Sequence, residues 1–300
     1  MLTKRQKFLN EMEQIVPWER LEKLIEPYYP KKGNGRPPKP LNAMLRVYCL
    51  QQWYALSDPG AEESLYDIPS LREFARLDLT DQAIPDETTI LRFRRLIEQH
   101  DLSKAIFEEI TIYLGEKGVR VSQGTLVDAT IIQAAASTKN KAKARDPEMH
   151  ATRKNNQYYF GMKVHIGTDV DSNVIHTATV TAANKADITE LPKLLREEDH
   201  VVFGDAGYTS DTDKRGARAL GISWQVNDKR KPKQNLSASQ KKKNRKKSSV
   251  RARVEHCFRV IKCQFGYRKA RYKGLVKNRV QVFMLLGLTN LYSLRYQLAG

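Results

Sequence analysis

The first part of the chain has the hydrophobic spacing of amphipathic helices. Up to about residue 118, apolar side chains recur three or four positions apart, as they do along one face of an α-helix. The segment 41–56 is apolar almost all round, which predicts a buried helix at the centre of this region. Asp86 follows Pro85 and is suited to cap the next long helix. Helices are predicted at residues 8–16, 21–25, 41–56, 60–67, 70–76, 84–100 and 102–114.

After Gly118 the apolar positions alternate, which is the spacing of β-strands. Along the segment 158–170, Lys163 and His165 point to the face opposite the apolar side chains. We interpret the first three strands as antiparallel, with hairpin-type connections. Strands are predicted at 125–132, 158–170 and 174–183, within 200–208 and at 222–226, and helices at 187–196, 211–220, 251–262 and 278–296.

This order of elements predicts a two-domain protein of the α/β (α+β) class. An all-helical domain occupies residues 1–118, and a mixed sheet with flanking helices occupies residues 119–300. Three strands, a helix, a fourth strand and later helices form the element order of a ribonuclease-H-like domain. In that topology the first strand is central, and the fourth strand pairs with it in parallel.

Composition narrows the class of partner. The chain has 300 residues, a net charge of +18 and an isoelectric point near 9.7, which favours a polyanion such as DNA, RNA or an anionic membrane surface. Apolar runs are too short to span a bilayer, and no apolar segment follows the N-terminus, so we expect no membrane span and no signal peptide. The three cysteines are scattered, which fits a reducing cytosol and matches no common zinc spacing.

Basic residues gather in particular segments. The segment 229–253 holds twelve Lys and Arg residues and no acid. The insertion at about 227–250 is therefore expected to be poorly ordered without a counterion. It is also expected to contact DNA phosphates through residues such as Lys242 and Lys246. A second basic, exposed loop is predicted at 133–157.

The helical domain offers weaker signals for DNA binding. Arg92 and Arg95 lie on the predicted helix 84–100, where a DNA-contacting helix is favoured slightly over a bundle helix with solvated arginines. The tripeptide Gly35–Pro37 is interpreted as a linker rather than as a minor-groove contact.

Three carboxylates are candidates for chemistry. Asp128 lies inside the first strand of the sheet, where a charge is costly without a partner or a metal ion. Asp205 ends the fourth strand, which should bring it beside Asp128. Glu255 lies on the predicted helix 251–262, and its apolar stripe would pack that helix on the sheet. Clustered carboxylates repel one another, and two divalent cations such as Mg²⁺ would remove that cost and support an in-line displacement at phosphorus.

The helix 251–262 has two neighbouring stripes. One is apolar and includes Val254, Phe258 and Ile261, whereas the other carries Arg251, Glu255, Arg259 and Lys262. Taken alone, Glu255 is best interpreted as paired with Arg259, four residues further along a solvated helix face, but Asp128 and Asp205 favour the interpretation as a site. His165 is interpreted as a core-edge histidine in preference to a site residue.

Nearly the whole chain resembles a DDE transposase of a bacterial insertion sequence, of the insertion-sequence-five family. The resemblance rests on a combination of motifs. They include YYPKKGNGRPP, MLRVYCLQQWYALSD and IPDETTILRFRRLIEQH in the first domain, and GTLVDATII, STKNKAKARDPEMH, FGMKVHIG, DAGY, RARVEHCFRVIK and ARYKGLVKN in the second. The family signature Tyr-x2-Arg-x3-Glu-x6-Lys is matched at Arg251, Glu255 and Lys262, with Ser248 at the Tyr position.

This resemblance implies a metal-binding triad of Asp128, Asp205 and Glu255, with Arg251, Lys262 and Arg259 on the DNA phosphates. It implies cleavage at the element's ends by water, then attack of the 3′-hydroxyl on target DNA, with two Mg²⁺ ions for which Mn²⁺ substitutes. The expected partners are double-stranded DNA, as terminal inverted repeats and as target, and a second copy of the chain. The expected location is the bacterial cytoplasm, with the nucleoid. Two alternatives stay open: a ribonuclease-H-like nuclease without strand transfer, and a catalytically silent DNA-binding regulator.

Overall fold

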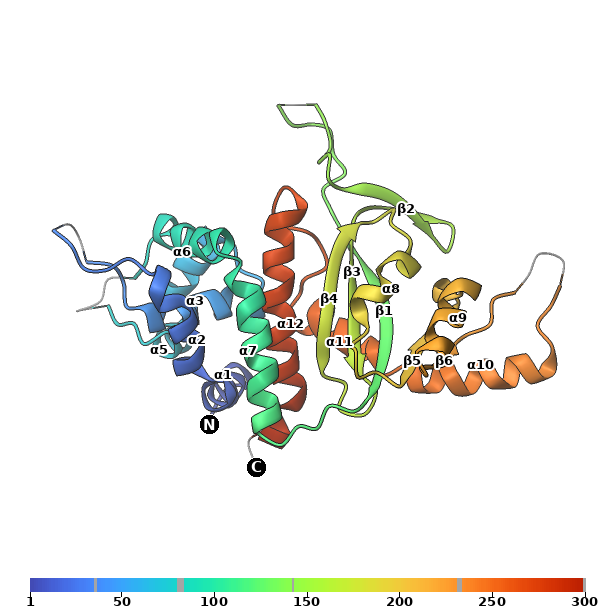
Figure 1. Ribbon diagram of the computed structural model, residues 1–300. Coiled ribbons are helices and arrows are strands. Elements are labelled where there is room, and N and C mark those ends of the chain that lie inside the picture. The colour runs from blue at the N-terminus through green and yellow to red at the C-terminus, as the bar shows by residue number, and fades with distance from the viewer. Residues whose placement is uncertain (35–36, 80–83, 142, 231–233, 299–300) are drawn as a thin grey trace. The chain divides into compact units, whose positions relative to one another are not determined.

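The computed structural model describes residues 1–34, 37–79, 84–141, 143–230 and 234–298 (Figure 1). These residues form two compact units. The first contains Met1–Lys117, Cys263–Gly266 and the described residues from Val280 onward, and the second contains Gly118–Lys262 and Tyr267–Arg279. Of the tripeptide interpreted as a linker, residues 35 and 36 lie outside the described part. No helix among the described residues is both long and apolar enough to cross a membrane.

The first unit is helical, as predicted. Its centre is α3, in which every side chain from Ala43 to Trp53 is buried. Asp86 caps α6, because its Oδ1 accepts a hydrogen bond of 2.6 Å from the Thr89 amide. The helices are α1 (Lys4–Ile15), α2 (Trp18–Ile25), the 3₁₀ turn η1 (Glu26–Tyr28), α3 (Leu41–Trp53), α4 (Asp58–Asp67), α5 (Pro69–Phe74), α6 (Glu87–Gln99) and α7 (Leu102–Glu116).

The C-terminal helix belongs mostly to the first unit, whereas the predicted division placed it in the second domain. The helix α12 (Leu275–Leu298) begins in the second unit, but from Val280 onward it belongs to the first. Phe283 meets Phe107 of α7 edge-on at 5.7 Å between ring centroids. A Cβ on Gly287 would lie 2.9 Å from Ile110 Cδ1, so glycine permits the close packing of α12 on α7. The helix therefore completes the helical core, which sequence order does not reveal.

The second unit is built on a mixed six-stranded sheet. Its path is β2-β3-β1-β5-β6, with β4 paired to β3. The β1–β3 and β3–β4 pairs are antiparallel, whereas β5 pairs in parallel with β1 and with β6. This arrangement, with β1 central, is the ribonuclease-H-like topology that the element order predicts. The strands are β1 (Gly124–Gln133), β2 (His150–Lys154), β3 (Gln157–Asp169), β4 (Ile175–Ala182), β5 (Val201–Gly204) and β6 (Ser223–Val226).

Short helices cover the sheet and follow it. The apolar side chains of Val127, Val202 and Tyr208 form a core with Leu191 and Leu194 of α8. The remaining elements are η2 (Asp187–Glu190), α8 (Leu191–Leu194), η3 (Ala206–Tyr208), α9 (Asp211–Ala219), α10 (Ala238–Arg251), α11 (Val254–Arg259) and the π-helical turn η4 (Val260–Gln264).

Part of the basic loop predicted at 133–157 is a strand. β2 pairs with the first residues of β3, from His150 opposite Gly161 to Lys154 opposite Gln157. Asn155 and Asn156 form the turn between them, with φ of 49° and 60°. Positive φ at both central residues favours a tight hairpin, and asparagine tolerates it. The Asn-Asn pair was the local signal for this hairpin.

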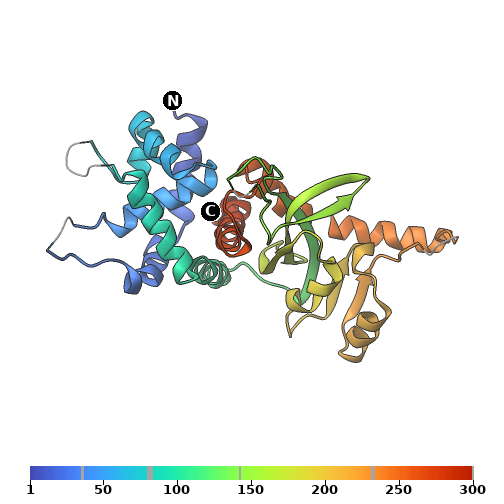
Figure 2. The same ribbon diagram turned by 90° about the horizontal axis from the view of Figure 1, so that it is seen from above.

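The described part of the basic insertion also has more order than predicted, while residues 231–233 of that insertion lie outside the described part. Residues 238–251 form α10, which projects away from β1 on the β5–β6 side in both views (Figures 1 and 2). Ser237 and Gln240 form a capping box at its start. Asn244 and Lys247 tie the helix to the end of β6, since Lys247 Nζ donates to the Val226 carbonyl at 2.8 Å. Lys and Arg are good helix formers, so these contacts are enough to order a strongly charged segment.

The segment 251–262 is not one regular helix, in contrast to the prediction. α10 ends at Arg251 and α11 begins at Val254. The Glu255 amide donates to the Ala252 carbonyl at 3.2 Å, three residues back, which tightens the turn between the two helices. The apolar stripe nevertheless holds, because Val254, Phe258 and Ile261 are all buried.

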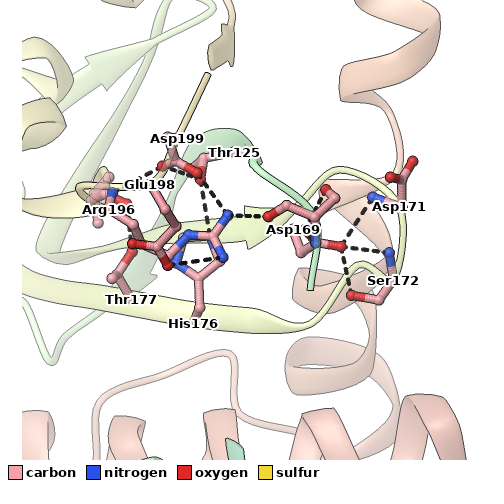
Figure 3. A network of polar contacts seen from close by, with 11 residues as sticks. Thr125, Asp169, Asp171, Ser172, His176, Thr177, Arg196, Glu198 and Asp199 are labelled. Carbon is pink, nitrogen blue, oxygen red and sulfur yellow. Dashed lines mark hydrogen bonds and ion pairs between the residues drawn. The ribbon is translucent and has the colours of Figure 1, made fainter. Parts of the chain in front are cut away.

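A polar network fixes the end of the sheet where β1 begins and β3 ends (Figure 3). The buried Asp169 accepts hydrogen bonds from the amide and the hydroxyl of both Ser122 and Ser172. The buried Asp199 accepts from Thr125 Oγ1 at 2.6 Å, and the same hydroxyl lies 3.1 Å from His176 Nε2. Each buried carboxylate is thus satisfied by several donors, which makes this end of the sheet rigid.

This network leads to a prediction about acid stability. Burial lowers the pKa of His176 to about 4, and it also lowers the pKa of His165. Unfolded histidine has a pKa of about 6.5, so the unfolded chain binds more protons between these values and the native state loses stability as the pH falls. We expect His176 to cost about 2 kcal/mol of unfolding free energy between pH 7 and pH 5.

Urea unfolding of the wild type and of His176→Gln at pH 7 and pH 5 measures this cost. The wild type should lose more stability than the variant on acidification. Burial raises the pKa of Asp128, which acts in the opposite direction in both proteins and cancels in the comparison. Equal losses in the two proteins would show that His176 is not the titrating group.

Candidate functional site

The structure brings two of the three predicted carboxylates together across neighbouring strands. Parallel pairing of β1 and β5 runs from Gly124 opposite Val201 to Leu126 opposite Phe203. Two residues further along each strand are Asp128 and Asp205, which therefore lie at matching positions where β5 ends. β1 continues for five more residues beyond this point, to Gln133.

Asp128 is a strongly perturbed acid. Its pKa is raised to about 6, and burial is the main cause. The Arg251 guanidinium and a 2.8 Å hydrogen bond from the Ala129 amide lower the pKa, whereas the negative charge of Asp205 contributes to the rise. A carboxyl that is buried beside another carboxylate is suited to binding a cation.

Arg251 joins Asp128 to the third predicted carboxylate. Its Nη1 lies 2.8 Å from Asp128 Oδ2, and its Nη2 lies 3.0 Å from Glu255 Oε1. The side chains of Arg251 and Asp128 are only 18% and 15% exposed, whereas that of Glu255 is 63% exposed. Glu255 therefore pairs with Arg251, four residues before it, and not with Arg259, four residues after it, as the local interpretation expected. The same guanidinium also neutralises the buried acid of the sheet.

Lys262 reaches the part of β1 that β5 does not cover. Its Nζ donates to Thr130 Oγ1 at 2.6 Å and to the Ile131 carbonyl at 2.8 Å. Both acceptors lie in the part of β1 that extends beyond β5. The two basic residues of the signature thus lie along one strand edge, Arg251 at Asp128 and Lys262 two to three residues further on.

Gly207 lies directly beside Asp205, within the motif DAGY, although the sequence analysis did not single it out as a candidate site residue. The Gly207 amide donates to Asp205 Oδ1 at 2.7 Å, and a Cβ there would lie only 2.9 Å from the same oxygen. Glycine therefore leaves space beside Asp205 that any larger residue would fill. A signal was present in the sequence, since Ala206 and Gly207 directly follow the strand that ends on Asp205.

His165 lies in the interior, in agreement with the interpretation as a structural histidine. Its ring is fully buried, and its Nε2 is 2.9 Å from Thr181 Oγ1. Lys163, on the same strand face, forms an ion pair of 2.8 Å with Asp187. Ser248, at the signature's Tyr position, accepts a hydrogen bond of 2.9 Å from Asn227 Nδ2 and so helps to tie α10 to the sheet.

The other candidate DNA contacts have exposed side chains. In the second unit these are Arg259 on α11 and Lys242 and Lys246 on α10. In the first unit they are Arg92 and Arg95 on α6, whereas the intervening Arg94 is largely buried and pairs with Asp58 at 2.8 Å. The exposed positions are accessible to a ligand, while Arg94 stabilises the packing of α6 on α4.

The donor chemistry fits a hard divalent cation, although the three acids are not gathered around one point. Asp128 and Asp205 supply oxygen ligands of the kind that Mg²⁺, Mn²⁺ and Ca²⁺ prefer. Within the part of the chain that the structure describes, no three His, Cys, Asp or Glu side chains lie close enough to hold one metal ion. Glu255 is connected to the pair through Arg251, so a cation bound by all three would require Arg251 to leave Asp128.

Comparison with known proteins bears on both units. The family model described as "Transposase DDE domain" matches residues 120–291, and that described as "Transposase domain (DUF772)" matches residues 1–96. Two solved structures share low similarity with the chain. One is the piggyBac transposase synaptic complex with hairpin DNA, with a TM-score of 0.48, 8% identity, and coverage of 96% of this chain and 73% of that chain. The other is the Mos1 strand transfer complex, with a TM-score of 0.21, 13% identity, and coverage of 80% and 82%. Because the first family model spans more than half of the chain, the protein belongs to the DDE-domain transposase family and is a DNA transposase.

Proposed function

We propose that Asp128, Asp205 and Glu255 form the active site of this transposase, which cuts DNA at the ends of its own element and joins the 3′-hydroxyl to target DNA. The observation that carries this proposal is the matched position of Asp128 and Asp205 at the end of β5. Strand ends are where a sheet presents side chains to a ligand, and β1 continues beyond this point along an edge that β5 does not cover.

A divalent cation bound to these carboxylates would activate the attacking oxygen and stabilise the leaving oxygen of an in-line displacement at phosphorus. Mg²⁺ is the proposed ion, and Mn²⁺ should replace it, because both prefer oxygen ligands. The raised pKa of Asp128 means that its carboxyl is protonated for part of the acidic range, so we expect ion binding to weaken below about pH 6.

The basic residues would position the substrate. Arg251 presents a planar guanidinium that matches a phosphate with two donors, and Lys262 supplies a point charge along the same strand edge. Arg251 is bonded to Asp128 and Glu255, and the partners of Lys262 include Thr130 and the Ile131 carbonyl. A DNA phosphate at the strand edge would offer both side chains stronger, charged acceptors.

We further propose that the substrate is double-stranded DNA carrying the terminal inverted repeats of an insertion sequence of the insertion-sequence-five family. Two DNA ends have to be joined to target DNA, so a dimer on DNA is the expected assembly. Its place of action would be the bacterial nucleoid. These proposals rest on the sequence motifs and on the basic surfaces of α10 and α6.

A joining assay tests the proposed function and separates it from its alternatives. The substrate is a duplex taken from DNA flanking the protein's own reading frame, with one strand cut in advance to leave a 3′-OH end. The proposal predicts Mg²⁺-dependent cleavage of the intact duplex and joining of the pre-cut end to plasmid DNA. Cleavage without joining would indicate a nuclease, and binding without either reaction would indicate a DNA-binding regulator.

The basic face of α10 yields a prediction about salt dependence. Lys242 and Lys246 lie one helical turn apart, and both are exposed. Each lost phosphate contact lowers the slope of log affinity against log salt by about 0.9. The double variant Lys242→Gln/Lys246→Gln should therefore show a slope shallower by about 2 in fluorescence anisotropy with duplex DNA.

The matched control is Lys185→Gln/Lys193→Gln. It removes two exposed lysines from the α8 side of the same unit. Its slope should stay within error of the wild type. If both double variants lower the slope equally, the effect is one of net charge, and α10 has no special role in DNA binding.

A further inference from the structure

A pocket lies where β1 ends, outside the carboxylate site. It has a volume of about 440 Å³. Its first wall consists of Ala134, Ala135, Ser137, Asn140, Lys141 and residues 144–146, and its second wall consists of residues 270–273. The strand leads directly into the first wall, because Ala134 and Ala135, which follow Gln133, line the pocket. The pocket thus continues the same strand that carries Asp128.

The second wall is fixed to the sheet. The Gln133 amide donates to the Arg268 carbonyl at 3.3 Å, and the Ala270 amide donates to the Gln133 carbonyl at 2.7 Å. The fully buried Asn278 then holds the turn that follows, since its Nδ2 donates to the carbonyls of Tyr272 and Gly274, each at 2.7 Å. The segment 270–273 is therefore held in position by the strand on one side and by a buried amide on the other.

Carboxylates near the pocket already have partners. Asp146 Oδ2 accepts from the Gly274 amide at 2.6 Å, and Glu148 Oε2 accepts from the Leu275 amide at 2.7 Å. Both acids therefore satisfy amides at the start of α12, where a helix favours negative charge. They also join the first wall to the second, so the pocket is a built structure rather than a gap between loops.

The pocket is strongly basic. Lys141, Arg145, Arg271 and Lys273 line it, against the single acid Asp146. Arg145 is held in place, because its Nε donates to the Ala136 carbonyl at 2.9 Å and its guanidinium lies 5.3 Å from the Phe160 ring centroid. Asn140 and Tyr272 add an amide and an aromatic ring. Convergent cations with an amide and a ring are suited to a phosphate and its sugar.

We propose that this pocket binds the phosphate backbone of one DNA strand, at a fixed distance from the bond that is cut. This inference rests on the proposed function, because it takes Asp128 as the point of cleavage. From Asp128 to Ala134 the chain advances six residues, about 20 Å along the strand, which corresponds to about six base pairs of duplex. The pocket would hold the DNA in register, while the carboxylates act on the scissile phosphate.

Replacing one DNA phosphate at a time with a neutral linkage tests this proposal. Methylphosphonate linkages are placed one at a time along the end duplex, and affinity is measured by anisotropy for the wild type and for Lys141→Gln/Lys273→Gln. We expect the wild type to lose at least about 5-fold in affinity at one or two adjacent linkages, about six base pairs from the cleavage point. The variant should bind the unmodified DNA more weakly and should be insensitive to those same linkages.

The matched control is Lys139→Gln/Lys277→Gln, which removes two exposed lysines near the same walls that do not line the pocket. It should keep the wild-type pattern. If Lys141→Gln/Lys273→Gln stays sensitive at every linkage, or weakens DNA binding no more than the control, the pocket does not hold the backbone. Binding is measured without cleavage, so this failure is distinct from a failure of the proposed function, in which the wild type would neither cut nor join DNA.

Discussion

Replacing Asp205 with Asn is expected to lower both strand cleavage and strand joining by at least about 10³-fold, or about 4 kcal/mol in the activation barrier. The reason is chemical: a neutral amide cannot supply the charge that a divalent cation requires beside Asp128. The fold should survive, because the new side chain can still accept the hydrogen bond of 2.7 Å from the Gly207 amide. Gel assays of cleavage and joining in Mg²⁺ measure the loss.

Asp187→Asn is the control for this experiment. Asp187 is a nearby acid that forms an ion pair of 2.8 Å with Lys163. Burial is the main cause of the raised pKa of Tyr208, and the negative charge of Asp187 also contributes to that rise. Its variant should retain activity within about 10-fold of the wild type, because the Asp187 carboxylate is already paired with Lys163 and is not one of the proposed cation ligands. Near wild-type activity in a folded Asp205→Asn protein would remove Asp205 from the active site.

Replacing Arg251 with Gln is expected to destabilise the protein in EDTA, by about 2–3 kcal/mol. The variant leaves the largely buried Asp128 without the guanidinium that lies 2.8 Å from it. Added Mn²⁺ should then stabilise the variant more than the wild type, because in the wild type the ion and Arg251 compete for the same carboxylates. Thermal unfolding across a Mn²⁺ titration measures both effects without any activity assay.

Arg251→Lys separates charge from shape in the same titration. An ammonium group is a single point charge, so we expect it to pair with Asp128 but not to bridge to Glu255, and to give an intermediate response to Mn²⁺. If Mn²⁺ stabilises the wild type and Arg251→Gln by the same amount, the guanidinium does not compete with the ion. Arg251 would then be a structural residue alone.

The sequence predicted the parts of the fold that depend on local pattern. Period-two alternation located β1, β3 and β4, and the element order predicted the parallel pairing of β5 with β1 that aligns Asp128 with Asp205. A carboxylate within an apolar strand is costly, which is why the sequence alone indicates Asp128 as a candidate. The buried stripe of α11 was predicted for the same reason, because apolar spacing encodes burial.

Tertiary contacts decided what the sequence did not reveal. α10 is ordered by Lys247, which bonds to the Val226 carbonyl at the end of β6, and by Asn244, which bonds to the Asp228 carbonyl just beyond it. Its composition, by contrast, is that of a solvated segment. The apolar α12 was predicted as a helix, but nothing in its composition shows that it belongs with α7 rather than with the preceding sheet. The bridge from Arg251 to Asp128 joins residues 123 positions apart, and spacing along one helix could predict only its pairing with Glu255.

The position of bound Mn²⁺ shows whether Asp128 and Asp205 form the cation site of the transposase. Anomalous scattering from crystals of the protein with a 3′-OH end duplex locates the Mn²⁺ ion. If Mn²⁺ supports turnover in the crystals, Ca²⁺ is used in its place to prevent the reaction. We expect Mn²⁺ within about 2.3 Å of carboxylate oxygens of both Asp128 and Asp205, with Arg251 moved from Asp128 onto DNA phosphate. Mn²⁺ bound elsewhere, with Arg251 still paired to Asp128 and the DNA end distant from β1, would contradict this expectation.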